Sequence, residues 1–253
     1  MAFILEAACL CLTGKVRKTN EDNFFFDGRC LQENNEGLKH PVVMEQKLRQ
    51  EVCMAVFDGM GGMNYGEAAS FAAAWCLQDS VRKLKDFFIP ERKFLIDRCM
   101  EMNDAVLKKK EEFCTDYMGT TIAALYFTSG NVYVCNVGDS RAYRLREGEF
   151  MQISKDHVET QRPGSAGKPS LTQHLGISPD EFLIEPYIAK GELQHGDCYL
   201  LCSDGLTDML TNIEIDGIMT QSGTAEECAE RLADAALTKG GKDNITVIVC
   251  RII

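Results

Sequence analysis

Short acidic motifs stand where apolar runs of this chain begin or end. Three of them lie far apart in the chain: Asp58-Gly59 after residues 54–57, Ser203-Asp204-Gly205 after residues 198–202, and Asp243-Asn244 before residues 245–250. Short apolar runs bounded by turn residues predict buried strands. Carboxylates that point from several strand ends toward one place are suited to bind hard divalent cations. The sequence therefore predicts strands that converge on a cation site.

Two further acidic motifs extend this pattern. Arg17-Lys18-Thr19-Asn20-Glu21-Asp22 lies near the start of the chain, and Gly138-Asp139-Ser140-Arg141 follows the apolar run 132–137. In chain order the five motifs resemble those of the metal-dependent Ser/Thr protein phosphatases of the 2C type (PPM family), and Asp58-Gly59-Met60-Gly61-Gly62 resembles the bacterial branch. The resemblance runs from Gly14 to Asn244. Since Asp-Gly is also a common turn dipeptide, the ordered set of motifs carries the resemblance.

The resemblance implies a centre of two Mn²⁺ or Mg²⁺ ions, with a third, weaker site. The implied ligands are Asp58 as the bridge between both ions, the Gly59 carbonyl for one of them, Asp204 and Asp243 for the first ion, Glu21 for the second with Asp22 binding its waters, and Asp139 with Asp204 for the third. Oxygen ligands favour Mg²⁺ or Mn²⁺ over Zn²⁺. Two such ions about 3.5–4 Å apart activate water and neutralise a phosphoryl group.

Arg17 matches the arginine that binds the substrate phosphate in this family, a task that suits a planar guanidinium. The chain departs from the family at the proton donor. Eukaryotic members have His where this chain has Met60, and many bacterial members have His where it has Met63. Methionine cannot transfer a proton, so the general acid stays unassigned, with a metal-bound water as one candidate. We expect His157, in the Asp156-His157 pair, to be structural.

Each of these residues also has a structural interpretation. The alternatives are turn residues for Asp58 and Asp204, a turn cap for Asp243, solvated surface for Glu21 and Asp22, a contact with Arg141 for Asp139, and a basic surface shared with Lys15 and Lys18 for Arg17. The presence of all five motifs favours the functional interpretation. The loop Val158–Ser170 is shorter than the flap of bacterial members, so the resemblance does not predict substrate choice.

Charge and composition exclude several classes of partner. The net charge of −11 would repel a nucleic-acid backbone or an anionic membrane. No apolar run approaches the ~20 residues that a membrane span needs. The start of the chain does not have the pattern of a secretory signal, and its 12 cysteines include no C-x-x-C pair, so we expect reduced, structural thiols in the cytoplasm.

Periodicity predicts an α+β protein, formed as a single domain over residues 1–253. Helices are expected at 67–77, 91–113, 206–219 and 225–237; strands at 3–12, 182–188, 197–202 and from 244; a meander over 118–127, 131–137 and 140–146; a hairpin excursion over 32–51; and an exposed loop over 158–170. The resemblance adds a four-layer αββα sandwich, two antiparallel sheets flanked by helix pairs.

The leading functional interpretation is a protein-serine/threonine phosphatase that acts on phosphoproteins of a Ser/Thr kinase, as a monomer. One alternative is a catalytically weak or inactive PPM-fold regulatory or binding module. A member that has lost catalysis should lack at least one of Asp58, Asp204 or Asp243, and this chain retains all three. A metal-dependent nuclease is disfavoured by the acidic charge and the absence of a basic patch.

Overall fold

The computed structural model describes residues 3–60, 65–83, 90–160 and 167–253. Its strands are β1 (Ile4–Leu12), β2 (Asp22–Phe25), β3 (Val42–Lys47), β4 (Val52–Met60), β5 (Gly119–Thr120), β6 (Ile122–Phe127), β7 (Asn131–Val137), β8 (Arg141–Arg146), β9 (Glu149–Gln152), β10 (Tyr187–Glu192), β11 (Cys198–Cys202) and β12 (Ile245–Ile252). Its helices are α1 (Gly66–Lys83), α2 (Glu91–Phe113), α3 (Asp204–Thr207), α4 (Asn212–Gln221) and α5 (Ala225–Thr238).

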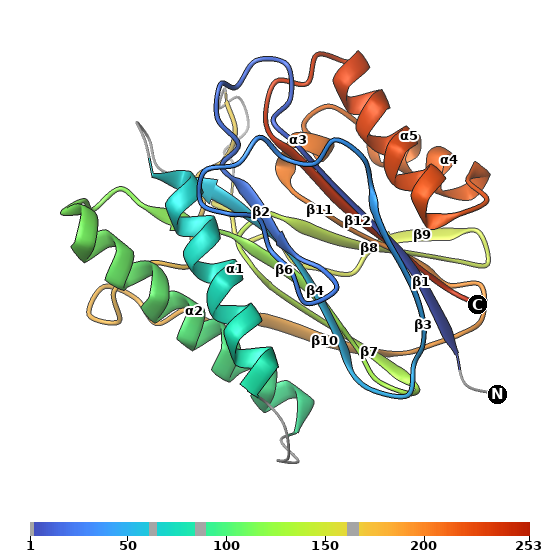
Figure 1. Ribbon diagram of the computed structural model, residues 1–253, viewed down its shortest axis with the longest axis horizontal. Helices are drawn as coiled ribbons and strands as arrows, with labels where there is room; N and C mark the ends of the chain where they lie inside the picture. Colours follow the sequence, from blue (N-terminus) through green and yellow to red (C-terminus); the bar gives the residue numbers. More distant parts are fainter. Residues whose placement is uncertain (1–2, 61–64, 84–89, 161–166) are drawn as a thin grey trace.

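The strands form two antiparallel sheets that pack face to face (Figure 1). One sheet has the order β3-β1-β12-β11-β8-β9, and the other has the order β10-β7-β6-β4-β2, with β5 paired to β4. Helices α1 and α2 cover the outer face of the second sheet, and α4 and α5 cover the outer face of the first. This is the predicted four-layer αββα sandwich.

Three apolar layers hold the sandwich together, and the alternation of side chains along each strand produces them. In β4, Cys53, Ala55 and Phe57 face the helices α1 and α2, whereas Val52, Met54 and Val56 face the opposing sheet. Both faces of β4 are therefore buried, which explains why its sequence is a continuous apolar run.

Strand β11 follows the same rule on the other sheet. Tyr199 and Leu201 point into the layer between the sheets, whereas Cys198, Leu200 and Cys202 pack under α4 and α5. All 12 cysteines are unpaired, and most of them are buried in these layers. No helix in the described part of the chain is long and apolar enough to cross a membrane.

Two predicted strands are placed differently. The predicted meander is wrong in its third strand, because β8 leaves the sheet of β6 and β7 and joins β11 in the other sheet. The predicted strand at 182–188 is also wrong at its start: the chain turns back on Ser178, with Phe182 N donating to Ser178 O at 3.1 Å, and β10 begins only at Tyr187. Pro186, which has no N–H to donate, directly precedes that strand.

Two other segments also differ from the prediction. The segment 32–51 does not pair with itself, because β3 adds to the edge of β1. The single helix predicted at 206–219 is two helices. Thr211 caps the second of them in a capping box with Glu214, and the chain between Thr207 and Thr211 is not helical.

Candidate metal centre and active site

Asp22 and Asp58 lie directly opposite each other on the paired strands β2 and β4. The Asp22 carboxylate accepts hydrogen bonds from Ser203 Oγ at 2.7 Å and from Thr246 Oγ1 at 2.6 Å. Both hydroxyl groups belong to the opposing sheet, in β12 and at the end of β11. Asp22 therefore ties the two sheets together beside Asp58.

The other predicted carboxylates come to the same end of the sandwich. Asp139 lies two residues after β7, Asp204 begins α3 two residues after the end of β11, and Asp243 lies two residues before β12. The pKa of Asp58 is raised well above its usual value, first by burial and then by the charges of Asp204, Asp22 and Asp139. These four carboxylates are thus close enough to repel one another.

Asp243 belongs to the same group of charges, because it acts on Asp22. Burial raises the pKa of Asp22 to about 7, against the two hydroxyl hydrogen bonds that favour its charged form, and the charges of Asp204 and Asp243 raise it further. Buried groups of like charge are costly unless a cation compensates them. The cluster therefore has the electrostatic character of a cation-binding site.

Glu21 and Gly59 lie together at a second edge of the cluster. A Cβ atom added at Gly66 would lie 2.7 Å from Glu21 Oε2 and 2.9 Å from the Gly59 carbonyl oxygen. The two oxygens expected to bind metal therefore face the same glycine, where α1 begins. Burial raises the pKa of Glu21, and the charge of Arg17 opposes this shift.

Arg17 pairs with a predicted metal ligand. Its Nη2 donates a hydrogen bond of 2.6 Å to Asp243 Oδ2, and this bond raises the pKa of the guanidinium. The side chain is 49% exposed, so the fork remains accessible from solvent. The alternative of a loose basic surface does not describe this contact, because Arg17 is held at the rim of the carboxylate cluster.

Lys168 supplies a second positive charge, which sequence reasoning missed. Its Nζ lies 3.1 Å from Asp139 Oδ2 and forms an ion pair with Asp204. The lysine lies in a loop rich in Gly, Pro and Ser. The loop sequence has no periodic pattern from which this contact could be predicted. Arg141, which the sequence offered as a partner of Asp139, instead binds Asp156 at 2.7 Å.

The donor set fits a hard divalent cation. Every predicted ligand presents oxygen, and the repulsion among the aspartates would be relieved by positive charge. Within the described residues, no three acidic, His or Cys side chains are placed so that they could already hold a metal ion together. Instead, Lys168 pairs with Asp139 and Asp204, and Arg17 pairs with Asp243. These side chains compensate part of the negative charge of the cluster.

Asn244 positions the Arg17–Asp22 segment and was not predicted as a functional residue. Its Nδ2 donates to Thr13 O at 2.8 Å and to Thr19 O at 2.9 Å, and its Oδ1 accepts from Glu21 N at 2.8 Å. The side chain is buried. Its place directly after Asp243 is the one sequence signal that could have found it.

Two described histidines, His157 and His174, contact segments that bear on the cluster. His157 Nδ1 accepts a hydrogen bond from Gly138 N at 3.1 Å, and burial lowers its pKa, so the ring fixes the turn before Asp139. Burial also lowers the pKa of His174, which packs on Gly119, the strand partner of Met60. Met63 lies outside the described residues.

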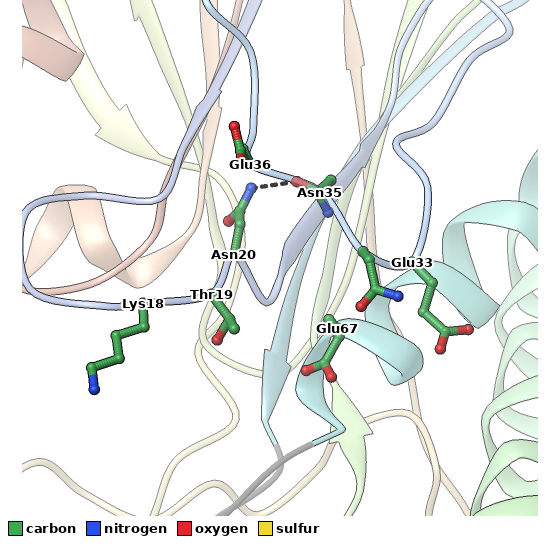
Figure 2. Close-up of a pocket in the computed structure, with 8 residues that line it drawn as sticks. Lys18, Thr19, Asn20, Glu33, Asn35, Glu36 and Glu67 are labelled. Carbon is green, nitrogen blue, oxygen red and sulfur yellow. Dashed lines mark hydrogen bonds between the residues drawn. The ribbon is translucent and has the colours of Figure 1, made fainter.

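The structure has a pocket of about 450 Å³, whose lining residues are drawn in Figure 2. It is lined by polar residues from three segments: Lys18, Thr19, Asn20, Glu33, Asn34, Asn35, Glu36 and Glu67. Asn20 Nδ2 donates to Asn35 Oδ1 at 2.7 Å across one wall. The pocket lies beside the centre because Asn20 directly precedes Glu21 and Glu67 directly follows Gly66.

The chain matches a known protein family over most of its length. The sequence pattern of the family described as "Protein phosphatase 2C" matches residues 42–239. The chain belongs to this family. Protein phosphatase 2C was the family that the five acidic motifs predicted, so that prediction is confirmed.

Individual members of the protein phosphatase 2C family are similar over nearly the whole chain. "Serine/threonine phosphatase stp" of Listeria innocua is 31% identical and covers 93% of this chain and 91% of its own length. "Serine/threonine protein phosphatase PstP" of Mycobacterium tuberculosis is 30% identical, covering 100% of this chain and 46% of that protein. These relatives are bacterial, as the DGMGG motif predicted.

Solved structures confirm the fold. The Mycobacterium tuberculosis serine/threonine phosphatase PstP/Ppp superposes with a TM-score of 0.79 at 28% identity, covering 98% of each chain. The catalytic domain of PstP in complex with two manganese ions superposes with a TM-score of 0.77 at 29% identity, covering 99% of each chain. Manganese, which this phosphatase 2C structure contains, is one of the two metals that the oxygen ligands of the present chain predict.

Proposed function

We propose that this chain is a cytoplasmic protein-serine/threonine phosphatase that hydrolyses phosphoserine and phosphothreonine in protein substrates. One observation carries the proposal: Asp58, at the partly exposed end of β4, lies among Asp22, Asp139 and Asp204, close enough for their charges to raise its pKa. Repulsion among these carboxylates destabilises the folded protein unless a cation compensates it. The arrangement is explained if the carboxylates bind Mn²⁺ or Mg²⁺, as the PstP catalytic domain binds two manganese ions.

The proposed ligands are those that the sequence implied: Asp58, Gly59, Asp204, Asp243, Glu21, Asp22 and Asp139. Bound Mn²⁺ or Mg²⁺ supplies positive charge to the phosphoryl oxygens and lowers the pKa of water. The protein's own residues hold the ions and orient the substrate. Arg17, at the rim and half exposed, binds the phosphate through its guanidinium fork. Met60 contributes no proton, so this chain supplies no side-chain acid at that position.

The pocket beside the centre offers space for substrate residues that flank the phosphorylated one. We propose that such substrates are products of a Ser/Thr kinase. The reduced cysteines support a cytoplasmic location, since thiols persist where disulfides do not form. Large exposed apolar side chains come from separate segments, among them Val43, Trp75 and Ile213, which supports a monomer.

A single domain over residues 1–253 is supported by the sheet order. Strands β1 and β12 lie near opposite ends of the chain and pair along eight residue positions, Leu5 to Leu12 with Ile252 to Ile245. The sheet that contains them cannot form from either half of the chain alone.

The test is phosphate release from a phosphothreonine peptide. We expect turnover with Mn²⁺, no turnover with excess chelator, and recovery when Mn²⁺ is restored. Asp58→Asn should abolish turnover, because it removes the proposed bridging charge while keeping the size of the side chain.

Asp234→Asn is the matched control, because Asp234 is an exposed carboxylate on α5, on the opposite face of the sandwich from α1 and α2. It should retain the wild-type rate. Full turnover by metal-free protein, or by Asp58→Asn, would contradict the proposal. The inactive regulatory module would be favoured if wild type bound Mn²⁺ but released no phosphate.

A further inference from the structure

The Lys168 side chain lies against three carboxylates that come from two segments. Its Nζ lies 3.1 Å from Asp139 Oδ2 and 3.8 Å from Asp208 Oδ2, and it donates a hydrogen bond to Asp204 Oδ2. The side chains of Asp139 and Asp204 are 9% and 19% exposed. The ammonium group therefore compensates a largely buried pair of negative charges.

The base of the loop that carries Lys168 is fixed to the turn that carries Asp139. Val158 and Leu171 form an isolated bridge at this base. His157 N donates to Gly138 O at 3.0 Å, and the His157 ring accepts from Gly138 N. Because Gly138 directly precedes Asp139, the two segments hold a fixed spacing, and Lys168 is three residues from the bridge.

An ordinary surface ion pair is the plain alternative. Such a pair joins two exposed side chains and contributes little. Lys168 differs, since one cation faces three carboxylates and two of these are largely buried. Asp139 and Asp204 are also the pair to which the family resemblance assigns a third, weaker metal.

We propose that Lys168 competes with a divalent cation for Asp139 and Asp204, so that the chain carries its own cation in place of the third metal. The inference rests on the proposed function and adds a residue that regulates metal occupancy. Placing a divalent ion beside the ammonium group would set like charges together. By thermodynamic reciprocity, Lys168 weakens metal binding at this pair, and metal bound there releases Lys168.

Calorimetric titration of the whole chain with Mn²⁺ tests the competition. We expect wild type to bind two ions tightly. In Lys168→Gln the weakest site should tighten by about five- to 150-fold, or a third ion should become measurable, because the competing charge is gone. Lys168→Arg keeps a cation and should resemble wild type. Lys155→Gln removes an exposed lysine from the neighbouring segment and should also resemble wild type.

The same titration separates this inference from the proposed function. Two ions bound equally well by wild type and Lys168→Gln would overturn the competition and leave the phosphatase proposal intact. A wild type that binds no Mn²⁺ would overturn both.

A second measurement uses wild type alone, in case the variant folds poorly. Acetic anhydride modifies accessible lysines, and mass spectrometry locates the acetyl groups. Saturating Mn²⁺ should increase acetylation of Lys168 at least severalfold while leaving Lys155 unchanged. Equal acetylation of Lys168 with and without Mn²⁺ would overturn the proposal.

Discussion

Arg17 Nη2 donates a hydrogen bond of 2.6 Å to Oδ2 of Asp243. The residue proposed to bind phosphate thus rests on a carboxylate proposed to bind metal, although the two lie at opposite ends of the chain. The contact fixes the guanidinium at the rim of the cluster before substrate arrives, which lowers the entropy that is lost on binding.

Arg17→Ala should lower kcat/KM on a phosphopeptide by roughly ten- to a hundredfold, since a charge-assisted hydrogen bond contributes about 1.5–3 kcal/mol. Arg17→Lys should recover part of this loss, because an ammonium group lacks the fork. Steady-state kinetics measure both effects, and a Mn²⁺ titration should show unchanged stoichiometry. Wild-type kcat/KM in Arg17→Ala would exclude a role in phosphate binding.

The metal-free protein should lose stability as pH rises. The folded-state pKa of Asp22 is raised to about 7, whereas an unfolded aspartate has a pKa of about 4. The folded state therefore binds more protons between these values. The protonated Asp22 side chain therefore stabilises the folded state. This contribution is complete below about pH 4 and is lost as pH rises toward 7, at up to about 1.4 kcal/mol per pH unit.

Thermal melts of metal-free wild type and Asp22→Asn between pH 5 and 8 measure this contribution. The asparagine keeps an oxygen that accepts from Ser203 and Thr246 but does not titrate. The melting temperature of wild type should fall relative to Asp22→Asn as pH rises. Parallel curves would show that Asp22 does not titrate in this window.

The sequence predicted the elements of the fold better than their assignment to sheets. Helix α2 has the predicted bounds because its apolar residues recur every three or four positions. Strand β8 was misplaced because its pattern is compatible with either sheet, and only the crossing at Gly138 decides between them. That glycine has φ +104°, and a Cβ atom there would lie 2.6 Å from the Thr121 side chain.

In the candidate site, too, local sequence patterns identify residues but not the contacts that the tertiary structure creates. The aspartates could be found because each lies at the boundary of an apolar run. Lys168 could not be found in this way, since its contact with Asp139 depends on where the loop base is fixed. Asn244 forms hydrogen bonds with residues more than 220 positions away, which no local pattern reveals.

Gly205→Ala should destabilise the protein by at least about 3 kcal/mol. An added Cβ would lie 1.8 Å from the Asn244 carbonyl oxygen, so the backbone beside Asp204 or Asp243 must shift. Urea unfolding measures the loss, and weaker Mn²⁺ binding should accompany it.

Gly217→Ala is the matched control for this prediction. Gly217 lies inside α4, and apart from the helix's own neighbouring backbone no described atom lies within 4 Å of an added Cβ. The substitution should stabilise the protein by about 0.5–1 kcal/mol, because alanine has the higher helix propensity. Equal effects of the two substitutions would show that Gly205 is not tightly packed.

Met60 should make turnover unusually dependent on the leaving group. It lies at the end of β4, two residues after Asp58, where the family's eukaryotic members have a histidine that can give up a proton. An aryl phosphate releases a phenolate that needs little protonation, whereas phosphoserine releases a far more basic alkoxide. We therefore expect rapid hydrolysis of aryl phosphate and slow hydrolysis of phosphoserine peptides.

Met60→His should narrow this difference by raising the rate on phosphopeptides more than the rate on aryl phosphate. The gain requires the imidazole to reach the leaving oxygen within about 3 Å or through one water. The ratio of the two rates, measured at saturating Mn²⁺, is the decisive quantity because it cancels any change in metal binding. General acid catalysis typically contributes about 10²–10⁴-fold, so even a partly aligned imidazole should change this ratio measurably. An unchanged ratio would mean that another group already protonates the leaving oxygen.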